Sequence, residues 1–171
     1  MKRIVRVLFV LGSLISPLSA FPSGARGRAV LEIGTAHAEV EYGRPSIKGR
    51  DVAEMLRYFK SGQEWRMGAD GPTTLKTTVN LRFRATVIPK GQYILKAKYL
   101  GETNARQTSM VNWQLLLQKE DETTVAEVPL KFEKAESSVE IMTIHLEKQG
   151  SQVRLTVLWG NFTLSATFRK A

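Results

Sequence analysis

Residues 75–87 read LKTTVNLRFRATV, and this stretch decides the fold class of the chain. Apolar and polar side chains alternate along it. The apolar positions are Leu75, Val79, Leu81, Phe83 and Val87, and the polar ones are Lys76, Thr78, Asn80, Arg82 and Arg84. A period of two over this length predicts one long, half-buried β-strand.

Further strands are predicted downstream of this one. Pro89 and Gly91 suit a turn, so a partner strand is expected over residues 92–100. Its apolar face would carry Tyr93, Leu95, Ala97 and Tyr99. Residues 101–109 are polar and rich in turn formers, which predicts a surface loop.

The C-terminal half continues the alternation. A strand is predicted over residues 111–118, with Trp113, Leu115 and Leu117 on one face. Another is predicted over residues 124–132, and its apolar face carries Ala126, Val128, Leu130 and Phe132. The next strand is marked by Met142, Ile144 and Leu146. Pro129 cannot donate to a ladder, so its strand should lie at an edge or carry a bulge. Residues 152–159 and 162–169, joined by Gly160 and Asn161, predict a tight hairpin.

One short helix is also predicted. Asp51 and Glu54 resemble a capping box, Val52, Met55, Leu56 and Phe59 have helical spacing, and Gly62 can end the element. About eight strands and one helix favour a mainly β fold, an antiparallel two-sheet β-sandwich or jelly roll. Leu81, Phe83, Trp113 and Trp159 are expected in its core.

The N-terminus has the order of a secretory signal peptide. Lys2, Arg3 and Arg6 precede a short apolar run over residues 4–15, and small residues follow. We expect residues 1–20 to be removed, with cleavage possible as late as Ala25, and residues 26–171 to form a single β domain. The protein would then be exported to the periplasm or the extracellular space, with no transmembrane span in its mature form.

Charge and composition narrow the function. The net charge is +9, and removal of Lys2, Arg3 and Arg6 leaves 22 basic against 16 acidic residues, a charge of +6. An exported protein rarely meets nucleic acid, so the expected partners are anionic or carbohydrate ligands of the cell envelope. The alternative is that the excess charge is only a solvated surface. The chain has no cysteine, which excludes disulfides and thiolate metal sites. No cofactor is expected.

Two segments carry the candidate ligand-binding residues. Tyr42, Arg44, Lys48 and Arg50 fall within nine residues, and guanidinium groups bind carboxylate or phosphate bidentately. Trp65, Arg66, Asp70 and Thr73 form a second cluster before the long strand. If the two loops meet, they would form a polar pocket with Trp65 as its floor.

Each cluster also has a structural interpretation. The first segment could be a turn whose arginines pair with nearby acids or carbonyls. In the second, Trp65 would be core, Arg66 would pair with Asp70, and Gly71 and Pro72 would form a turn. His37 and His145 are isolated, which makes a poor metal site, and no residue set has the pattern of a catalytic centre.

Two motifs, VEYGRPSIKGR at residues 40–50 and WRMGAD at residues 65–70, resemble the bacterial domain of unknown function family DUF2911. Weaker matches follow in order: IPKGQY at residues 88–93, Trp113, and LTVLW at residues 155–159. The resemblance extends from about Ala29 to the end of the chain. It implies an exported, mainly β domain without an assigned activity.

These observations lead to one functional hypothesis and two alternatives. The first is an exported, non-enzymatic binding or interaction domain for an anionic or sugar-like ligand. The second is an envelope hydrolase that uses Asp70, Arg66 and Tyr42. The third is a structural subunit that pairs through a sheet edge. A deep pocket with a desolvated acid would favour the hydrolase.

Overall fold

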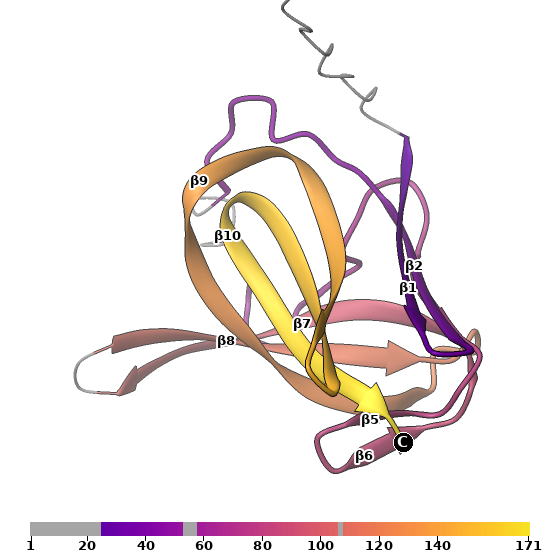
Figure 1. Ribbon diagram of the computed structural model, residues 1–171. Helices are drawn as coiled ribbons and strands as arrows, with labels where there is room; N and C mark the ends of the chain where they lie inside the picture. The colour runs from indigo at the N-terminus through magenta and orange to yellow at the C-terminus, as the bar shows by residue number, and fades with distance from the viewer. Residues whose placement is uncertain (1–24, 53–57, 106–107) are drawn as a thin grey trace, which may run out of the picture.

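A computed structural model describes residues 25–52, 58–105 and 108–171. The chain is mainly β and antiparallel, as predicted (Figure 1). The strands are β1 (Arg26–Ile33), β2 (Ala36–Gly43), β3 (Glu64–Trp65), β4 (Thr73–Thr77), β5 (Leu81–Phe83), β6 (Thr86–Ile88), β7 (Gly91–Ala105), β8 (Thr108–Gln118), β9 (Thr124–Gln149) and β10 (Gln152–Lys170). Residues 53–57 of the predicted helix lie outside the described residues, as does the predicted signal peptide. Residues 58–62, which the prediction placed in the end of this helix, form turns and irregular structure instead.

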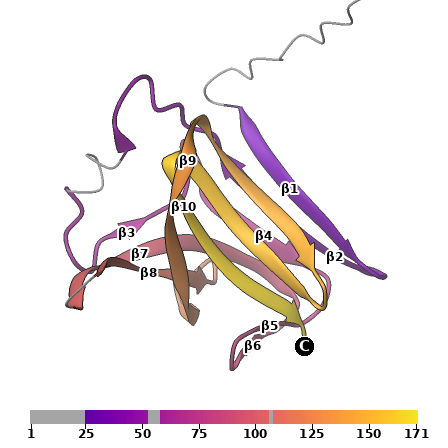
Figure 2. The same ribbon diagram turned by 60° about the vertical axis from the view of Figure 1, so that its left-hand side comes forward.

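All strands join one open antiparallel sheet. Its order is β1-β2-β4-β7-β8-β9-β10-β5-β6, and β3 pairs with β7. The two separate sheets of a sandwich are therefore not confirmed. The core is enclosed instead because β9 and β10 are long and bend together, so that their two halves form the limbs of a U (Figures 1 and 2).

Gly160 marks this bend in β10. The prediction of a hairpin at Gly160 and Asn161 is wrong, because β10 runs through both residues as one strand. Gly160 has a φ of 59°, and the pairing with β9 shifts register on both sides of it. A glycine in the left-handed region allows a β-bulge, which bends the strand without ending it.

The stretch that decided the fold class is not one long strand. It forms β4, then β5 and β6, with a turn at Arg84 and Ala85 between the last two. β4 pairs with β7 in the register Leu75–Tyr93, and residues 81–88 form a separate hairpin between these two strands. Of this hairpin, β5 pairs with β10 and β6 pairs with β5 alone. Val87 is consequently 40% exposed rather than buried, and its neighbour Ile88 is buried.

The polar stretch at residues 101–109 is also strand where it is described. β7 continues to Ala105 and β8 begins at Thr108, and these two residues are paired. The pair forms a hairpin that projects from the body of the sheet (Figure 1). The predicted surface loop is thus wrong, because backbone pairing with β8 does not require apolar side chains.

The predicted core is confirmed. Leu81, Phe83, Trp113 and Trp159 are all buried in one cluster, and the apolar faces predicted for β7, β8 and β9 point into it. Pro129 lies where β9 pairs with β8 only, since pairing with β10 begins at Lys131. β9 as a whole lies between β8 and β10 and is not an edge strand, but its segment at Pro129 is unpaired on the side toward β10, which accommodates a residue without an N–H group.

Within the described residues, no helix is both long and apolar enough to cross a membrane.

Candidate functional site

The segment that follows β2 is fastened to β9. Ile47 N–H donates to Glu140 O at 2.9 Å, and Met142 N–H donates to Pro45 O at 3.0 Å. These bonds form an isolated bridge between Ser46 and Ile141. The loop with the predicted cations is therefore held against the C-terminal limb of β9.

Glu140 strengthens this attachment. Its carboxylate accepts hydrogen bonds from the Ser46 hydroxyl and, at 3.0 Å, from Lys48 N–H. Both bonds favour the ionised form, so the pKa of Glu140 lies below its usual value, with the Ser46 bond as the larger cause. Lys48 itself is exposed and has a φ of 49°. The loop conformation thus depends on an ionised carboxylate.

Arg50 also stabilises the loop from within. Its Nε donates to Ile47 O at 2.9 Å and its Nη2 to Ser46 O at 3.1 Å. These are the backbone carbonyl contacts that the structural interpretation predicted. Arg50 lies beside a different hollow, next to Asp51 and Gly160, and not beside Arg44.

Tyr42 and Arg44 pack over β1 and reach toward β9. The Tyr42 ring is buried, and a Cβ on Gly27 would lie 2.5 Å from its Cζ and 2.8 Å from Arg44 Cδ. Gly27 therefore allows both side chains to approach the β1 backbone. Arg44 is half-buried, and it makes long contacts of 3.5 Å from Nε to Met142 O and from Nη2 to Thr143 Oγ1. Arg44 thus spans the gap between β2 and β9.

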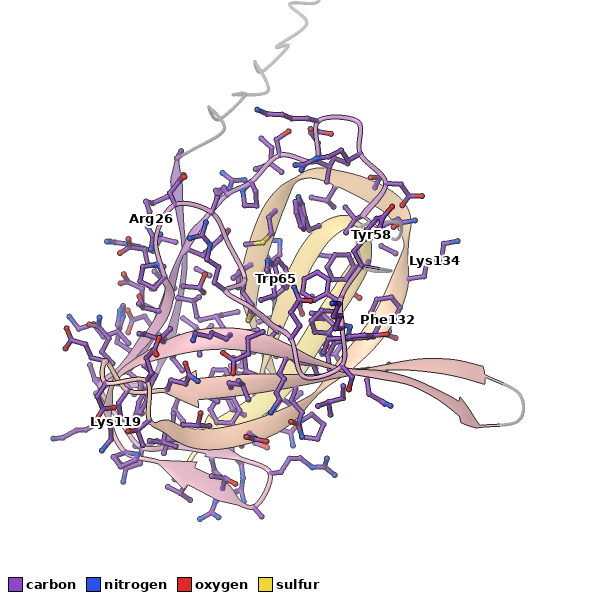
Figure 3. The ribbon with its side chains drawn as sticks, turned by 180° about the vertical axis from the view of Figure 1, so that it is seen from behind. Arg26, Tyr58, Trp65, Lys119, Phe132 and Lys134 are labelled. Carbon is purple, nitrogen blue, oxygen red and sulfur yellow. The ribbon has the colours of Figure 1, made fainter. Side chains whose placement is uncertain are left out.

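This gap is a groove of about 510 Å³, which we call the β1–β9 groove. Its lining comprises Arg26, Gly27, Arg28, Ala29, Val30, Tyr42, Arg44, Thr143, Ile144, His145 and Leu146. Three arginines and no acidic side chain belong to this set, and buried apolar residues lie between them. Figure 3 shows Arg26 at the start of β1, on one side of the molecule.

Two of the three arginines form ion pairs on the outer face of the β1–β2 hairpin. Arg26 Nε lies 2.8 Å from Glu41 Oε1, and Arg28 Nε lies 3.0 Å from Glu39 Oε1. The Arg28 side chain is 63% exposed. An ion pair of an exposed side chain contributes only about 0–1 kcal/mol, so an anionic ligand can compete for the Arg28 guanidinium group. Arg26 is held more firmly, because its Nη2 also donates to Pro72 O at 2.9 Å.

His37 extends the same row of charges. Its Nδ1 lies 2.8 Å from Glu32 Oε1 and its Nε2 lies 3.3 Å from Glu39 Oε2. The two carboxylates, with Glu32 as the larger cause, raise the pKa of His37 above 6.5. Among the described residues, no group of three or more acidic or histidine side chains is arranged to hold a metal ion.

The second predicted cluster divides between two places. Gly68 and Ala69 pack against Gly43, where a Cβ would lie 1.9 Å from Ala69 O. Thr73 is fully buried, and its Oγ1 donates to Met67 O at 2.8 Å. The two predicted loops therefore do meet, but through close-packed backbone and not through a polar pocket.

Trp65 points away from this meeting place. Its ring stacks on Trp159 with centroids 5.9 Å apart and approaches Trp113 and Phe162 edge-on or tilted. It lies over the concave side of the bent β9–β10 ribbon (Figure 3). The indole N–H groups of Trp113 and Trp159 are buried without a hydrogen-bond partner in the described part of the chain. Trp65 thus belongs to an aromatic cluster, as the structural interpretation held.

Arg66 and Asp70 are exposed, and no ion pair between them is present among the described residues. The structure therefore does not bring Arg44, Arg50 and Arg66 onto one surface with Tyr42 and Trp65. Of the predicted ligand-binding residues, Tyr42 and Arg44 line the β1–β9 groove, and the other predicted residues do not line it.

Arg26, Arg28 and His145 line the groove although the sequence pattern did not single them out as binding residues. The sequence does contain a pattern that indicates the hairpin of Arg26 and Arg28. Polar and apolar residues alternate in RGRAVLEI and in AHAEVEYG, and Gly34 and Thr35 between them suit a tight turn. In that hairpin, arginines on one strand meet glutamates on the other. His145 could not be placed, because its proximity to β1 depends on the course of β9.

Comparison with known proteins gives one match. The family described as "Protein of unknown function (DUF2911)" matches residues 25–168. No curated protein and no solved structure matches the chain.

Proposed function

The chain belongs to the DUF2911 family of proteins of unknown function, and from its own site we propose that it is a binding module for an anionic ligand. The ligand would lie in the β1–β9 groove. The observation that carries this proposal is that Arg44 reaches over a groove whose lining has no acidic side chain, and that Arg26 and Arg28, each paired with a glutamate of β2, stand at its β1 edge. Guanidinium groups bind carboxylate and phosphate in a planar, bidentate geometry.

The shape of the groove supports an extended ligand. Arg26 and Arg28 stand two residues apart on β1, and Arg44 packs beside Gly27 and reaches to Thr143 on β9. Gly27, Ala29, Ile144 and Leu146 supply an apolar floor between them. An acidic glycan has this combination of spaced carboxylates and apolar ring faces. We therefore propose an acidic oligosaccharide of the cell envelope as the ligand class.

Arg44 is the residue best placed to hold the ligand. Its contacts with Met142 O and Thr143 Oγ1 limit the movement of its guanidinium group before a ligand arrives. Pre-ordering of a side chain reduces the entropy cost of binding, which is about 0.5–1.5 kcal/mol for a long side chain. Arg28 is more exposed, and its role is to add a second charge-assisted contact.

The test is calorimetric titration of the purified protein with trigalacturonic acid, and with a neutral galactose trisaccharide as the ligand control. Arg44→Ala should weaken binding of the acidic sugar by roughly 10- to 150-fold, the equivalent of about 1.5–3 kcal/mol for a lost charge-assisted bond. Arg28→Ala should act in the same direction without touching the Arg44 contacts. Lys119→Ala removes one exposed charge elsewhere and should leave the affinity unchanged.

Equal binding of the neutral and acidic sugars would contradict charge recognition. Unchanged binding in both arginine variants would contradict the groove as its location. If Arg44→Ala strongly reduced the urea midpoint, Arg44 would be needed for folding. The effect of Arg28→Ala on the affinity for the acidic sugar would then test whether the groove binds it.

The hydrolase alternative has less support. A general acid or base that works near neutrality needs a desolvated or otherwise perturbed environment. The side chains of Asp70 and Arg66 are exposed to solvent, whereas Tyr42 is buried in the core. The structural-subunit alternative is also weaker. The strand β6 at one end of the sheet has only three residues, and β1 at the other end lies against β9.

A further inference from the structure

β9 and β10 part at a point that the groove does not include. Their ladder ends at the pair Lys131–Ser165, and no register pair joins them beyond it. From there β9 continues as the partner of β8, whereas β10 pairs again only at Arg169, with β5. Pro129 has no N–H group with which β9 could bond at this position. The two strands therefore form a fork.

A cavity of about 360 Å³ occupies this fork. Its lining comprises Arg84, Val128, Pro129, Leu130, Lys131, Arg154, Ser165, Ala166 and Thr167. These residues come from β9, from both limbs of β10 and from the turn between β5 and β6. Figure 1 shows the β5–β6 hairpin beside the C-terminal end of β10. The bend in β10 is what brings Arg154 and Thr167 to one cavity.

The lining has three cations and no acidic side chain. Lys131 is already bonded to Glu133, with Nζ 2.6 Å from Oε1. Within the part of the chain that the structure describes, the side chains of Arg84 and Arg154 form neither a hydrogen bond nor an ion pair. Glu147 stands opposite Arg154 in the ladder, yet the two side chains are not in ion-pair contact. Two guanidinium groups are thus available at the fork.

Arg84 occupies a position that does not favour arginine. It has a φ of 52° in the two-residue turn between β5 and β6, where asparagine or glycine is preferred. The turn directs this residue to the cavity lining. Ser165, which is 8% exposed, and Thr167 add hydroxyl donors on the β10 side.

We propose that the fork is a second anion site, which binds a phosphate or sulfate group between Arg84 and Arg154. The several acceptor oxygens of such a group match two planar guanidinium forks and neighbouring hydroxyls. Lys131 contributes positive charge at the rim. The site is separate from the β1–β9 groove, so this proposal does not depend on the proposed binding of an acidic oligosaccharide there.

The test is a ¹H–¹⁵N NMR titration of the purified protein with inorganic phosphate at constant ionic strength. The expected shifts lie at the backbone amides of Arg84, Lys131 and Thr167. Arg84→Gln and Arg154→Gln should each weaken phosphate binding at least about tenfold, because each removes one charge-assisted contact. Lys119→Gln makes the same change in net charge outside the fork and should bind as the unchanged protein does.

Arg84→Lys and Arg154→Lys keep the charge and lose the planar fork, and both should bind more weakly than the unchanged protein. Phosphatidylcholine vesicles with and without phosphatidylglycerol separate a lipid headgroup from a free phosphate compound as the source of the anion. Vesicle binding that needs phosphatidylglycerol and both arginines identifies the lipid; phosphate binding alone identifies the soluble compound. The proposal would be overturned if phosphate caused no chemical-shift changes, or if the changes lay at the β1–β9 groove. It would also be overturned if the changes persisted in both Arg84→Gln and Arg154→Gln.

Discussion

Gly160 lies at the bend of β10, where the pairing with β9 shifts register. Its φ of 59° allows β10 to bend, and a Cβ at this position would lie 2.5 Å from Val52 Cγ2. The residue is therefore restricted twice, by its backbone conformation and by the side chain that packs against it. Gly150 has a nearly identical φ of 61° but open space around it.

This pair allows the two restrictions to be measured separately. Gly150→Ala should cost about 1–2 kcal/mol for the left-handed conformation alone. Gly160→Ala should lose about 1–3 kcal/mol more through overpacking against Val52. Urea unfolding measures both values, and Val52→Ala in the Gly160→Ala background should recover part of the difference. Equal costs at the two glycines would show that Val52 does not crowd the bend.

The His37 ion pairs predict a pH dependence. Since its pKa is raised in the folded state, the contribution to stability is present in full below about pH 6.5 and is lost as the pH rises through the raised value. NMR titration of the His37 ring should show a lower pKa in Glu32→Gln and in Glu39→Gln. Glu41→Gln, which removes the partner of Arg26 instead, should leave the His37 titration unchanged. A pKa that stayed the same in both first variants would contradict the assigned cause.

At the scale of the element, residues 75–88 show how an alternating pattern can persist across a change of partner. Leu75, Leu81 and Phe83 are all buried, as one strand would have them, yet β4 and β5 pair with different neighbours. Asn80 Oδ1 accepts a hydrogen bond from Lys90 N–H at 2.9 Å and joins the two ends of the hairpin over residues 81–88. The alternation changes phase at the turn after Phe83. Odd-numbered residues face the core before the two turn residues, and even-numbered ones such as Ile88 face it after them.

Substitutions at neighbouring residues test this register. Ile88→Ala should cost about 2–5 kcal/mol, because the side chain is buried. Val87→Ala should change the stability by no more than about 0.5 kcal/mol, because it is 40% exposed. Urea midpoints measure both. A larger loss of stability in Val87→Ala than in Ile88→Ala would support a single strand over residues 75–87 instead.

At the scale of the whole molecule, we expect an exported protein whose N-terminus is processed. The basic start, short apolar run and small residues before Ala20 or Ala25 are the basis for this expectation. Expression in a bacterial host, isolation of exported material and N-terminal sequencing should return a chain that begins after one of these alanines. A chain that still begins at Met1 would contradict the prediction.

The candidate groove was predictable only in part. Tyr42 and Arg44 drew attention by their type and spacing, and both line the groove. Arg50 and Trp65 drew the same attention but have structural roles, in loop carbonyl contacts and in aromatic stacking. Residue type indicates what a side chain can bond to, and it does not indicate whether the partner is a ligand or the protein's own backbone.

What the sequence by itself determined is the class of the fold and the inward side of most strands. These are local properties, because successive side chains of a strand point to opposite faces wherever the strand is placed. The sequence also showed that arginines and aromatic residues gather near Tyr42 and Trp65. Only the tertiary structure decided that Gly160 bends one strand instead of joining two, and that β1 lies against the limb of β9 that holds Thr143. Both outcomes depend on contacts between residues that are distant in the chain, and a bulge glycine and a turn glycine have the same local conformational freedom. The bend also brings Arg154 and Thr167, from the two limbs of β10, to the one cavity at the fork.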